Sequence, residues 1–289
     1  MWWALAHRLT ALPLRWLLNY RWGGGSLISL FVSILSGIVI ALQYDPSAPF
    51  HTTSAIELLA PYGSFWRGLH YYSSQAFFLL LLGHLAAVLW KGETTHTRSA
   101  WIRLCMTIPC AVLLLFTGYV LRGDATGEAA GAIAEHICLS VPLVGSFLND
   151  LLFALADSGL RKVYAHHLIG LVVLGGVAAW PHLRRYTAAW RNHLLLVVIT
   201  LLVTVAIPVP MEPNRYGLLF IAGPWFFLGL QELLRTMHPF VAGVLVPLLP
   251  VALLCWLPTA FRPRALTLWA IGLWLVLYAV FTWLCLLRI

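Results

Sequence analysis

The chain has 289 residues, of which 61% are hydrophobic and only 10% are charged, and its mean hydropathy is +0.86. A soluble domain usually carries about 25% charged residues, so this composition excludes a soluble globular enzyme and indicates an all-α, polytopic membrane protein. The net charge of +8 indicates basic loops beside the membrane spans. No nucleic-acid partner is therefore predicted.

The first predicted element is an amphipathic helix over residues 1–22, whose Trp and Arg side chains would anchor it in the membrane interface. A signal peptide is the alternative, but the segment lacks a continuous apolar core and a small-residue cleavage site. Spans of roughly 20 apolar residues, the length that a bilayer requires, are then predicted at 26–43, 69–90, 102–121, 163–181, 193–208, 239–257 and 266–287.

The distribution of Lys and Arg predicts the orientation of these spans. With the N-terminus inside, the inner side collects 11 basic residues and the outer side collects 7. We therefore expect a multi-pass protein of the bacterial cytoplasmic (inner) membrane, with a cytoplasmic N-terminus and a periplasmic C-terminus. The five cysteines form neither a CxxC nor a CxxCH motif, so no covalently attached c-type haem is expected.

Four histidines lie inside the apolar spans as two pairs. His70 and His84 are 14 residues apart in the second span, and His167 and His182 are 15 apart in the fourth. On an α-helix, 14 residues return to within about 40° of the same face, about 21 Å along, and 15 residues overshoot by about 60°. A single histidine in a membrane helix is as readily a packing residue as a ligand. Two pairs at nearly equal spacing favour two metal centres, because ionisable residues in lipid are costly.

If the second and fourth spans are neighbours, each histidine on one faces a histidine on the other. Both spans run from outside to inside, which pairs His70 with His167 near the outer face and His84 with His182 near the inner face. Haem iron takes two axial imidazoles in this way, whereas zinc prefers clustered tetrahedral ligands, so two b-type haems are expected. His166 is the alternative to His167, but its separation of 16 residues from His182 places the two about 160° apart.

Several stretches resemble the cytochrome b family of quinol–cytochrome c oxidoreductases. Arg-Gly-Leu-His at 67–70, followed by His84, is similar to the family's second helix. Residues 116–121 resemble the end of the family's third helix. Residues 141–145 resemble its surface helix, and residues 162–167 resemble the start of its fourth helix. The resemblance covers nearly the whole chain and fits the plastid-type arrangement, in which four haem-binding helices are followed by three more.

This resemblance implies roles for further residues. Arg67 would pair with a haem propionate, and the alignment over 162–167 selects His167 as the ligand. Three glycines, Gly23, Gly37 and Gly118, match positions at which the flat macrocycle approaches the backbone. The position 14 residues before Gly118 carries Leu104 instead of glycine, so packing around the inner haem is expected to differ. Basic residues beside the inner haem could contact propionates or a quinone, namely Arg184, Arg185 and His193.

The predicted domains are an interfacial helix at 1–22, a four-helix di-haem b domain at 23–190 and a three-helix C-terminal domain at 191–289. The last resembles the family's subunit IV and would hold a quinone site.

The outer segment departs from the family pattern. The family carries Pro-Glu-Trp-Tyr there, and its Glu takes a proton from quinol, whereas this chain has Trp225 directly after Pro224. Glu232 is the candidate catalytic residue that would substitute, and the alternative is a membrane-edge Glu paired with Arg235. The candidates for lining an outer quinone site are Tyr119, Asp124, Trp225, Phe226 and Glu232.

The predicted function is that of a di-haem b membrane subunit of a respiratory complex, part of a quinol/quinone oxidoreductase. It would transfer electrons between the quinone pool (ubiquinone or menaquinone) and a periplasmic multihaem cytochrome c or iron–sulfur protein. One alternative is a bc-type bifurcating quinol oxidase subunit with a Rieske partner, and another is a haem-free transporter or structural membrane protein. Membrane lipid surrounds the chain in every case, and a homodimer within a larger complex is a further expectation.

Overall fold

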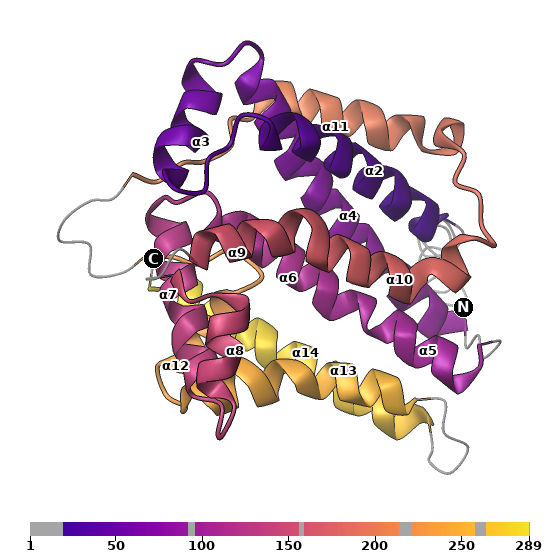
Figure 1. Ribbon diagram of the computed structural model, residues 1–289. Helices are drawn as coiled ribbons and strands as arrows, with labels where there is room; N and C mark the ends of the chain where they lie inside the picture. Colours follow the sequence, from indigo (N-terminus) through magenta and orange to yellow (C-terminus); the bar gives the residue numbers. More distant parts are fainter. Residues whose placement is uncertain (1–19, 92–95, 156–158, 214–220, 258–263, 289) are drawn as a thin grey trace. The chain divides into compact units, whose positions relative to one another are not determined.

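The computed structural model describes residues 20–91, 96–155, 159–213, 221–257 and 264–288 (Figure 1). Throughout these residues the regular structure is helical, without strands, which confirms the predicted all-α class. Residues 1–19 of the predicted interfacial helix lie outside the described residues. The chain forms two compact units, called unit 1 (1–40, 64–95 and 186–209) and unit 2 (41–63, 96–185 and 210–289).

Unit 1 is built from three apolar helices, α2 (Trp22–Ala41), α4 (Gly63–Lys91) and α11 (Leu194–Ala206), the last preceded by the short 3-10 turn η3 (Trp190–His193). The buried face of α2 carries small residues, which allow close approach of a neighbouring helix in a membrane. Ser26 donates a hydrogen bond to the carbonyl of Phe77 on α4 at 3.1 Å. The other buried residues of α2 repeat at helical spacing, namely Gly25, Ser29, Ser33 and Ser36.

Unit 2 contains the remaining elements. Its first half comprises α3 (Pro49–Leu58), α5 (Arg98–Cys105), α6 (Thr107–Val120), α7 (Ala125–Leu139) and α8 (Gly145–Leu152). Then follow α9 (Gly159–Ala165), the π-helical turn η2 (His166–Gly170), α10 (Leu171–Leu183), α12 (Leu228–Leu234), the π-helical turn η4 (Val241–Leu245), α13 (Val246–Trp256) and α14 (Arg264–Leu286). Helix α10 packs on α6, and α14 packs on α12 and α13.

The predicted third span is divided into α5 and α6 by a short break at Met106. Pro109 accounts for this break, because proline has no N–H to donate to the carbonyl of Cys105 and its ring crowds that carbonyl. The hydroxyl of Thr107 instead donates to the carbonyl of Leu104 at 2.6 Å. The two helices together still form a continuous apolar segment, Arg98–Val120.

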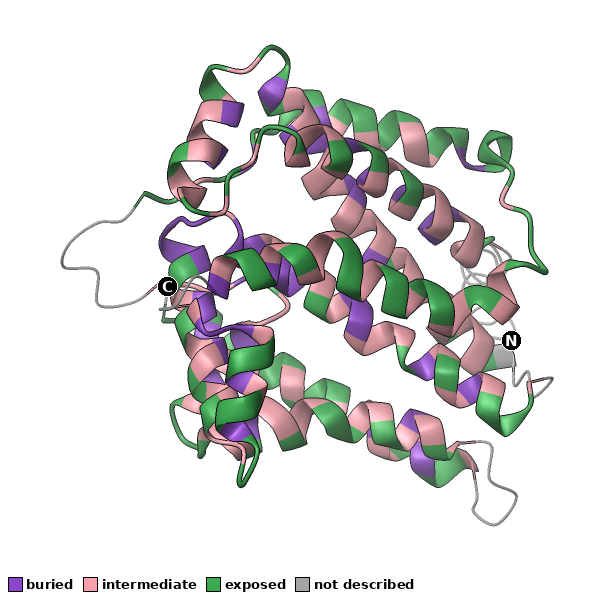
Figure 2. Ribbon diagram, in the orientation of Figure 1, coloured by how far each residue is buried: buried purple, intermediate pink, exposed green. Residues whose placement is uncertain are grey.

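Among the described residues, five helical segments are long and apolar enough to span a membrane. Two shorter apolar helical segments, Trp190–Ala206 and Val241–Trp256, occupy the predicted fifth and sixth spans. Figure 2 shows exposed faces along α11 and α14, and the exposed side chains there are apolar, as lipid-facing residues are, including Leu195, Val205, Trp269 and Leu273. The chain is therefore a multi-pass membrane protein, with helix positions close to those predicted.

Candidate haem and quinone sites

His70 on α4 is held by the backbone of α2 in unit 1. Its Nδ1 lies 2.8 Å from the carbonyl oxygen of Ser33. Because a carbonyl oxygen can only accept, Nδ1 must carry the proton and donate it. In the neutral ring Nε2 is then the nitrogen that carries the lone pair. Metal-binding histidines are commonly oriented by such a bond from their second nitrogen.

Two glycines of α2 lie directly against the two histidines of α4. A Cβ atom built on Gly37 would come within 2.8 Å of His70 Cε1, and one built on Gly23 within 3.2 Å of His84 Cε1. Carbon atoms do not approach so closely without displacement, so a side chain at Gly37 would push the imidazole aside. The glycines are 14 residues apart, like the histidines, so both contacts repeat with the same period.

A third ring packs against the same glycine-rich start of α2. His193 is 3% exposed, and its Nε2 lies 2.7 Å from where a Cβ of Gly24 would be. The hydroxyl of Tyr20 is 3.1 Å from His193 Nδ1 and 2.9 Å from a Cβ built on Gly25. The sequence prediction named His193 but not Tyr20. The run of three glycines at 23–25 is the sequence signal that could have predicted close packing of several side-chain rings against this turn.

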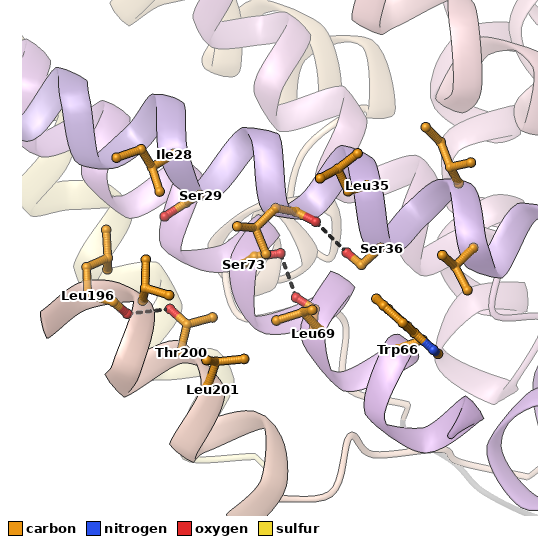
Figure 3. Close-up of a pocket in the computed structure, with 14 residues that line it drawn as sticks. Ile28, Ser29, Leu35, Ser36, Trp66, Leu69, Ser73, Leu196, Thr200 and Leu201 are labelled. Atoms are coloured by element: carbon orange, nitrogen blue, oxygen red, sulfur yellow. Dashed lines mark hydrogen bonds between the residues drawn. The ribbon is translucent and has the colours of Figure 1, made fainter. Parts of the chain in front are cut away.

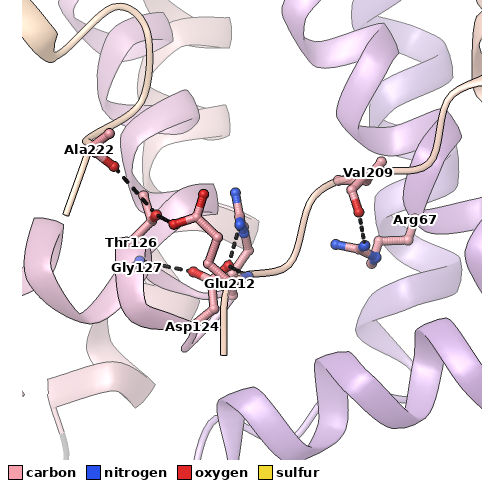
Figure 4. A network of polar contacts seen from close by, with 8 residues as sticks. Arg67, Asp124, Thr126, Gly127, Val209, Glu212 and Ala222 are labelled. Carbon is pink, nitrogen blue, oxygen red and sulfur yellow. Dashed lines mark hydrogen bonds and ion pairs between the residues drawn. The ribbon is translucent and has the colours of Figure 1, made fainter. Parts of the chain in front are cut away.

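Arg67 lies one turn before His70 and is 7% exposed. Its Nη2 donates to the carbonyl of Val209 at 2.8 Å (Figure 4). This bond connects the start of α4 to the residues after α11 within unit 1. The guanidinium is a cation with five donors, a group that can also pair with an acidic partner.

In unit 2, His166 and His167 stand at the start of the π-helical turn η2, which is closed by the N–H of Leu171 donating to the carbonyl of His166. A π turn contains one residue more than an α turn, and such turns are frequent at functional sites. The Nε2 of His166 donates to the carbonyl of Leu151 at 2.9 Å. His166 is thereby directed toward α8.

His167 is oriented toward α6. Its Nδ1 lies 2.9 Å from Thr117 Oγ1, and the Thr117 hydroxyl donates its own proton to the carbonyl of Leu113 at 2.7 Å. Nδ1 therefore donates, and Nε2 carries the lone pair, as in His70. A Cβ on Gly118 would lie 3.2 Å from His167 Cε1, which repeats the glycine–histidine contacts of unit 1.

His182 follows Pro181 near the end of α10. Its ring meets that of His96 edge to face, with ring centroids 5.7 Å apart. Arg184 and Arg185 come directly after α10 and are exposed. The predicted ligand role of His70, His84, His167 and His182 remains a prediction, as does the role of the two arginines.

Three of the predicted outer quinone residues come together in unit 2. The rings of Tyr119 and Phe226 lie edge to face at 5.8 Å between centroids, and those of Phe226 and Trp225 at 5.6 Å. The guanidinium of Arg122 lies 5.2 Å from the Tyr119 ring centroid. The end of α6 and the segment before α12 thus form one aromatic cluster.

Asp124, next to this cluster, is fully buried. Its carboxylate pairs with Arg122 and accepts bonds from the backbone N–H groups of Gly127 at 3.0 Å and Glu212 at 3.1 Å (Figure 4). Glu212, which sequence reasoning missed, accepts from the Thr126 hydroxyl at 2.7 Å. Glu212 is exposed and has no sequence motif around it. Asp124 thus caps α7 and holds the segment that contains Glu212.

Glu232 on α12 is 5% exposed. Its Oε1 lies 3.1 Å from both Nε and Nη2 of Arg288, and its Oε2 is 3.8 Å from Arg235 Nε. The carboxylate is thus shared between two arginines. This geometry matches the alternative of a paired, membrane-edge glutamate and adds Arg288 as the nearer partner.

Comparisons with known proteins agree with this geometry. Residues 9–187, well over half of the chain, match the family model described as Cytochrome b/b6/petB. Cytochrome b6 of Heliomicrobium gestii is 29% identical over 159 residues, covering 54% of this chain and 75% of that protein. Cytochrome b of Schizosaccharomyces japonicus is 23% identical over 286 residues, covering 83% and 72%.

Among solved structures, a chain of a "Hyperthermophilic respiratory Complex III" shares the fold, with a TM-score of 0.69 at 17% identity. The alignment covers 91% of this chain and 82% of that one. The chain therefore belongs to the cytochrome b family of quinol–cytochrome c oxidoreductases, membrane electron-transfer proteins that bind b-type haem and quinone.

Proposed function

We propose that this protein is the di-haem b subunit of a respiratory complex and carries electrons across the membrane between the quinone pool and a periplasmic redox partner. The observation that carries this proposal is the repeated contact of a glycine with a histidine, found for Gly37 and His70, Gly23 and His84, and Gly118 and His167. A glycine beneath a ligand leaves room for a flat macrocycle against the backbone.

The donor set fits b-type haem. His70 and His167 each donate a hydrogen bond through Nδ1, which places the lone pair on Nε2, the nitrogen that an axial imidazole would use. Haem b supplies reversible one-electron chemistry when it is bound. The chain would hold one haem between His70 and His167 and a second between His84 and His182, with Arg67 as a propionate partner for the first.

The proposed inner quinone site contains His193, with Arg184 and Arg185 as further candidates. The His193 imidazole is linked to the Tyr20 hydroxyl, and it packs on Gly24, the residue next to the glycine that contacts His84. A quinone at this position would lie close to the inner haem ligand. His193 is able to hydrogen-bond a quinone oxygen, because an imidazole both donates and accepts.

A quinone analogue tests this proposal. Purified protein is reduced, a short-tailed ubiquinone or menaquinone analogue is added, and the b-type α-band is followed with time. We expect reoxidation by at least one analogue, and slower reoxidation in a His193→Phe variant whose haem content is unchanged. Haems that stay reduced with an unaltered spectrum after both analogues would contradict quinone exchange.

A bc-type bifurcating enzyme with a Rieske partner is the second candidate, favoured by the family match and by the likeness to the respiratory Complex III chain. Against it, no Glu follows Pro224, Glu232 is shared between two arginines, and Asp124 is committed to Arg122 and two backbone groups. Glu212, whose backbone N–H donates to Asp124, is an exposed carboxylate in this part of unit 2. Identification of the co-purifying subunits separates the two functions, since a Rieske protein supports bifurcation and a multihaem cytochrome supports the conduit.

A further inference from the structure

Unit 1 contains a cavity of about 500 Å³ between α2, α4 and α11 (Figure 3). Its polar lining consists mainly of serine and threonine hydroxyls, of which Ser36, Ser73 and Thr200 donate to carbonyls of their own helices. Among the described residues that line this cavity, none carries a thiol, a carboxylate or an imidazole. The cavity therefore offers space but no reactive group.

Reactive sulfur is found in unit 2, which contains all five cysteines of the chain. Two of them, Cys105 of α5 and Cys255 of α13, lie where these two helices pack against each other. Their thiols are close enough to interact through a side-chain hydrogen bond. The two residues are far apart in the sequence and belong to no CxxC motif, so the fold alone brings them together.

A hydrogen bond beside the two thiols fixes how α5 lies against α13. The indole N–H of Trp101 donates to the carbonyl of Leu254 at 2.7 Å, and both residues are buried. Cys105 is four residues after Trp101 and therefore lies on the same face of α5. Cys255 directly follows Leu254. This contact holds the two sulfur atoms near each other while both cysteines are free.

The two thiols differ in their exposure. Cys105 is 3% exposed, whereas Cys255 is half-buried. A small oxidant can reach Cys255 from outside the helix pair but has little access to Cys105. Susceptibility of a cysteine to oxidation follows its accessibility, so Cys255 is the thiol that reacts first and Cys105 is the thiol that can attack the oxidised sulfur.

The apolar surroundings of the pair favour an uncharged product. The two cysteines lie in the apolar segments Arg98–Val120 and Val241–Trp256, where charged groups are costly. Two cysteines could also hold a soft ion such as Cu(I), but the sulfur ligands would then be thiolates. A cuprous ion between two thiolates carries a net negative charge, whereas a disulfide carries none.

We propose that Cys105 and Cys255 form a reversible disulfide between α5 and α13, with hydrogen peroxide as the oxidant. The sulfur of Cys255 attacks one peroxide oxygen, the O–O bond breaks, and the departing hydroxide takes the thiol proton and leaves as water. Cys255 is then a sulfenic acid. The sulfur of Cys105 attacks that of Cys255, the S–O bond breaks, and the hydroxyl leaves with the Cys105 proton as a second water.

The two sulfur atoms together lose two electrons, which reduce one peroxide to two waters. An external dithiol reverses the reaction by exchange and is itself oxidised to a disulfide. The bond would restrain more than α13, because α13 also packs on α14. The indole N–H of Trp274 on α14 donates to the carbonyl of Val246 on α13 at 3.0 Å. The disulfide would thus restrict movement of the last two helices relative to α5.

Thiol counting in the purified haem protein, before and after treatment with hydrogen peroxide, tests the proposal. The denatured untreated protein should show five free thiols, and the treated protein two fewer, with a cross-linked peptide pair that contains Cys105 and Cys255. Dithiothreitol should restore all of the thiols. The oxidised protein should unfold at a temperature higher by about 5 °C or more, as expected for a disulfide that closes a long loop.

Single variants separate the roles of the two sulfurs. Cys105→Ala should stop at the sulfenic acid of Cys255, which dimedone traps, and Cys105→Ser serves if this variant fails to fold. Cys255→Ala should give neither a disulfide nor a dimedone adduct. The matched control is Cys110→Ala, a buried cysteine of α6, which should form the Cys105–Cys255 bond as the unaltered protein does. Haem content reports that each variant is folded.

Three results would overturn the proposal. The first is an unchanged thiol count after peroxide treatment of the unaltered protein. The second is a disulfide that forms equally well in Cys255→Ala, since another pair would then be responsible. The third is a purified protein that holds one copper ion per chain whose removal frees Cys105 and Cys255 for alkylation, because the pair would then be a metal site.

Discussion

At the scale of single residues, the hydrogen bonds behind His70 and His167 decide which nitrogen faces a metal. One bond goes to the carbonyl of Ser33 and the other to the hydroxyl of Thr117. Both leave Nε2 with its lone pair, although the acceptors differ and come from different helices. A backbone carbonyl cannot be removed by substitution, whereas Thr117 can be replaced by the isosteric valine.

Thr117→Val should weaken haem binding at the outer site by about 10–100-fold, the effect typical of lost partners behind a metal ligand. The chain should still fold, because valine preserves the shape. Haem content and the α-band after mild detergent washing measure this. Thr204→Val is the control, since the Thr204 hydroxyl donates to its own helix at 2.7 Å. Equal haem loss in the two variants would show that the His167 bond has no special role.

Gly37→Leu should displace the His70 ring, because even a Cβ atom would lie 2.8 Å from Cε1. We expect the variant to bind one haem per chain instead of two. The control is Gly272→Leu on α14, where an added Cβ meets no heavy atom within 4 Å. Full haem content in Gly37→Leu, measured as the pyridine haemochrome, would contradict a macrocycle packed on this glycine.

At the scale of elements, the π turn η2 explains how unequal spacings give equivalent histidine pairs. The 15 residues from His167 to His182 overshoot by about 60° on a regular helix. The π turn absorbs one residue, or about 100°, and leaves the second histidine about 40° short of the first. This is the relation that 14 residues give between His70 and His84 on α4.

Single-residue deletions test this register. Deleting Ile169, an exposed residue of η2, should convert the turn to α-helix and keep both haems. Deleting Leu79, an exposed residue of α4, should rotate His84 by about 100° relative to His70 and remove one haem. Haem content per chain is the readout. If the Ile169 deletion lost a haem and the Leu79 deletion kept both, the proposed role of the π turn in aligning the histidines would be contradicted.

Beside the contact of α12 with α14, Glu232 of α12 pairs with Arg288, two residues after the end of α14. Glu232→Gln should destabilise the protein by about 1–2 kcal/mol, less than for a fully buried pair because Arg288 is half exposed. Quinol turnover should not change if the carboxylate is structural. Thermal unfolding and turnover are compared with those of Asp150→Asn, an exposed residue of α8. Slower turnover at unchanged stability would instead make Glu232 a proton acceptor.

The sequence allowed the helices to be predicted, because apolar length and helical period are local properties, and the pairing of the four histidines stays a prediction. It did not reveal the π turn at 166–170, since nothing in the composition of this stretch distinguishes π from α. Tyr20 and Glu212 were missed because each gains its role from a distant partner, His193 and Asp124 respectively. The break at Met106 follows from Pro109, which divides the predicted span 102–121 into two helices.

At the scale of the whole molecule, family membership makes the chain a membrane cytochrome b, while its own residues argue for a conduit between quinone and a partner protein. The predicted domains at 1–22, 23–190 and 191–289 remain predictions, as do the orientation in the membrane and the partners. The central claim is that one chain holds two b-type haems.

Counting haem in the purified protein tests this claim most directly, combined with the single-ligand variants His70→Leu and His84→Leu. We expect two haems b per chain in the unaltered protein, one in each variant, and none covalently attached. A ratio of one or zero in the unaltered protein, or the loss of both haems in one variant that remains folded, would contradict the proposed di-haem conduit.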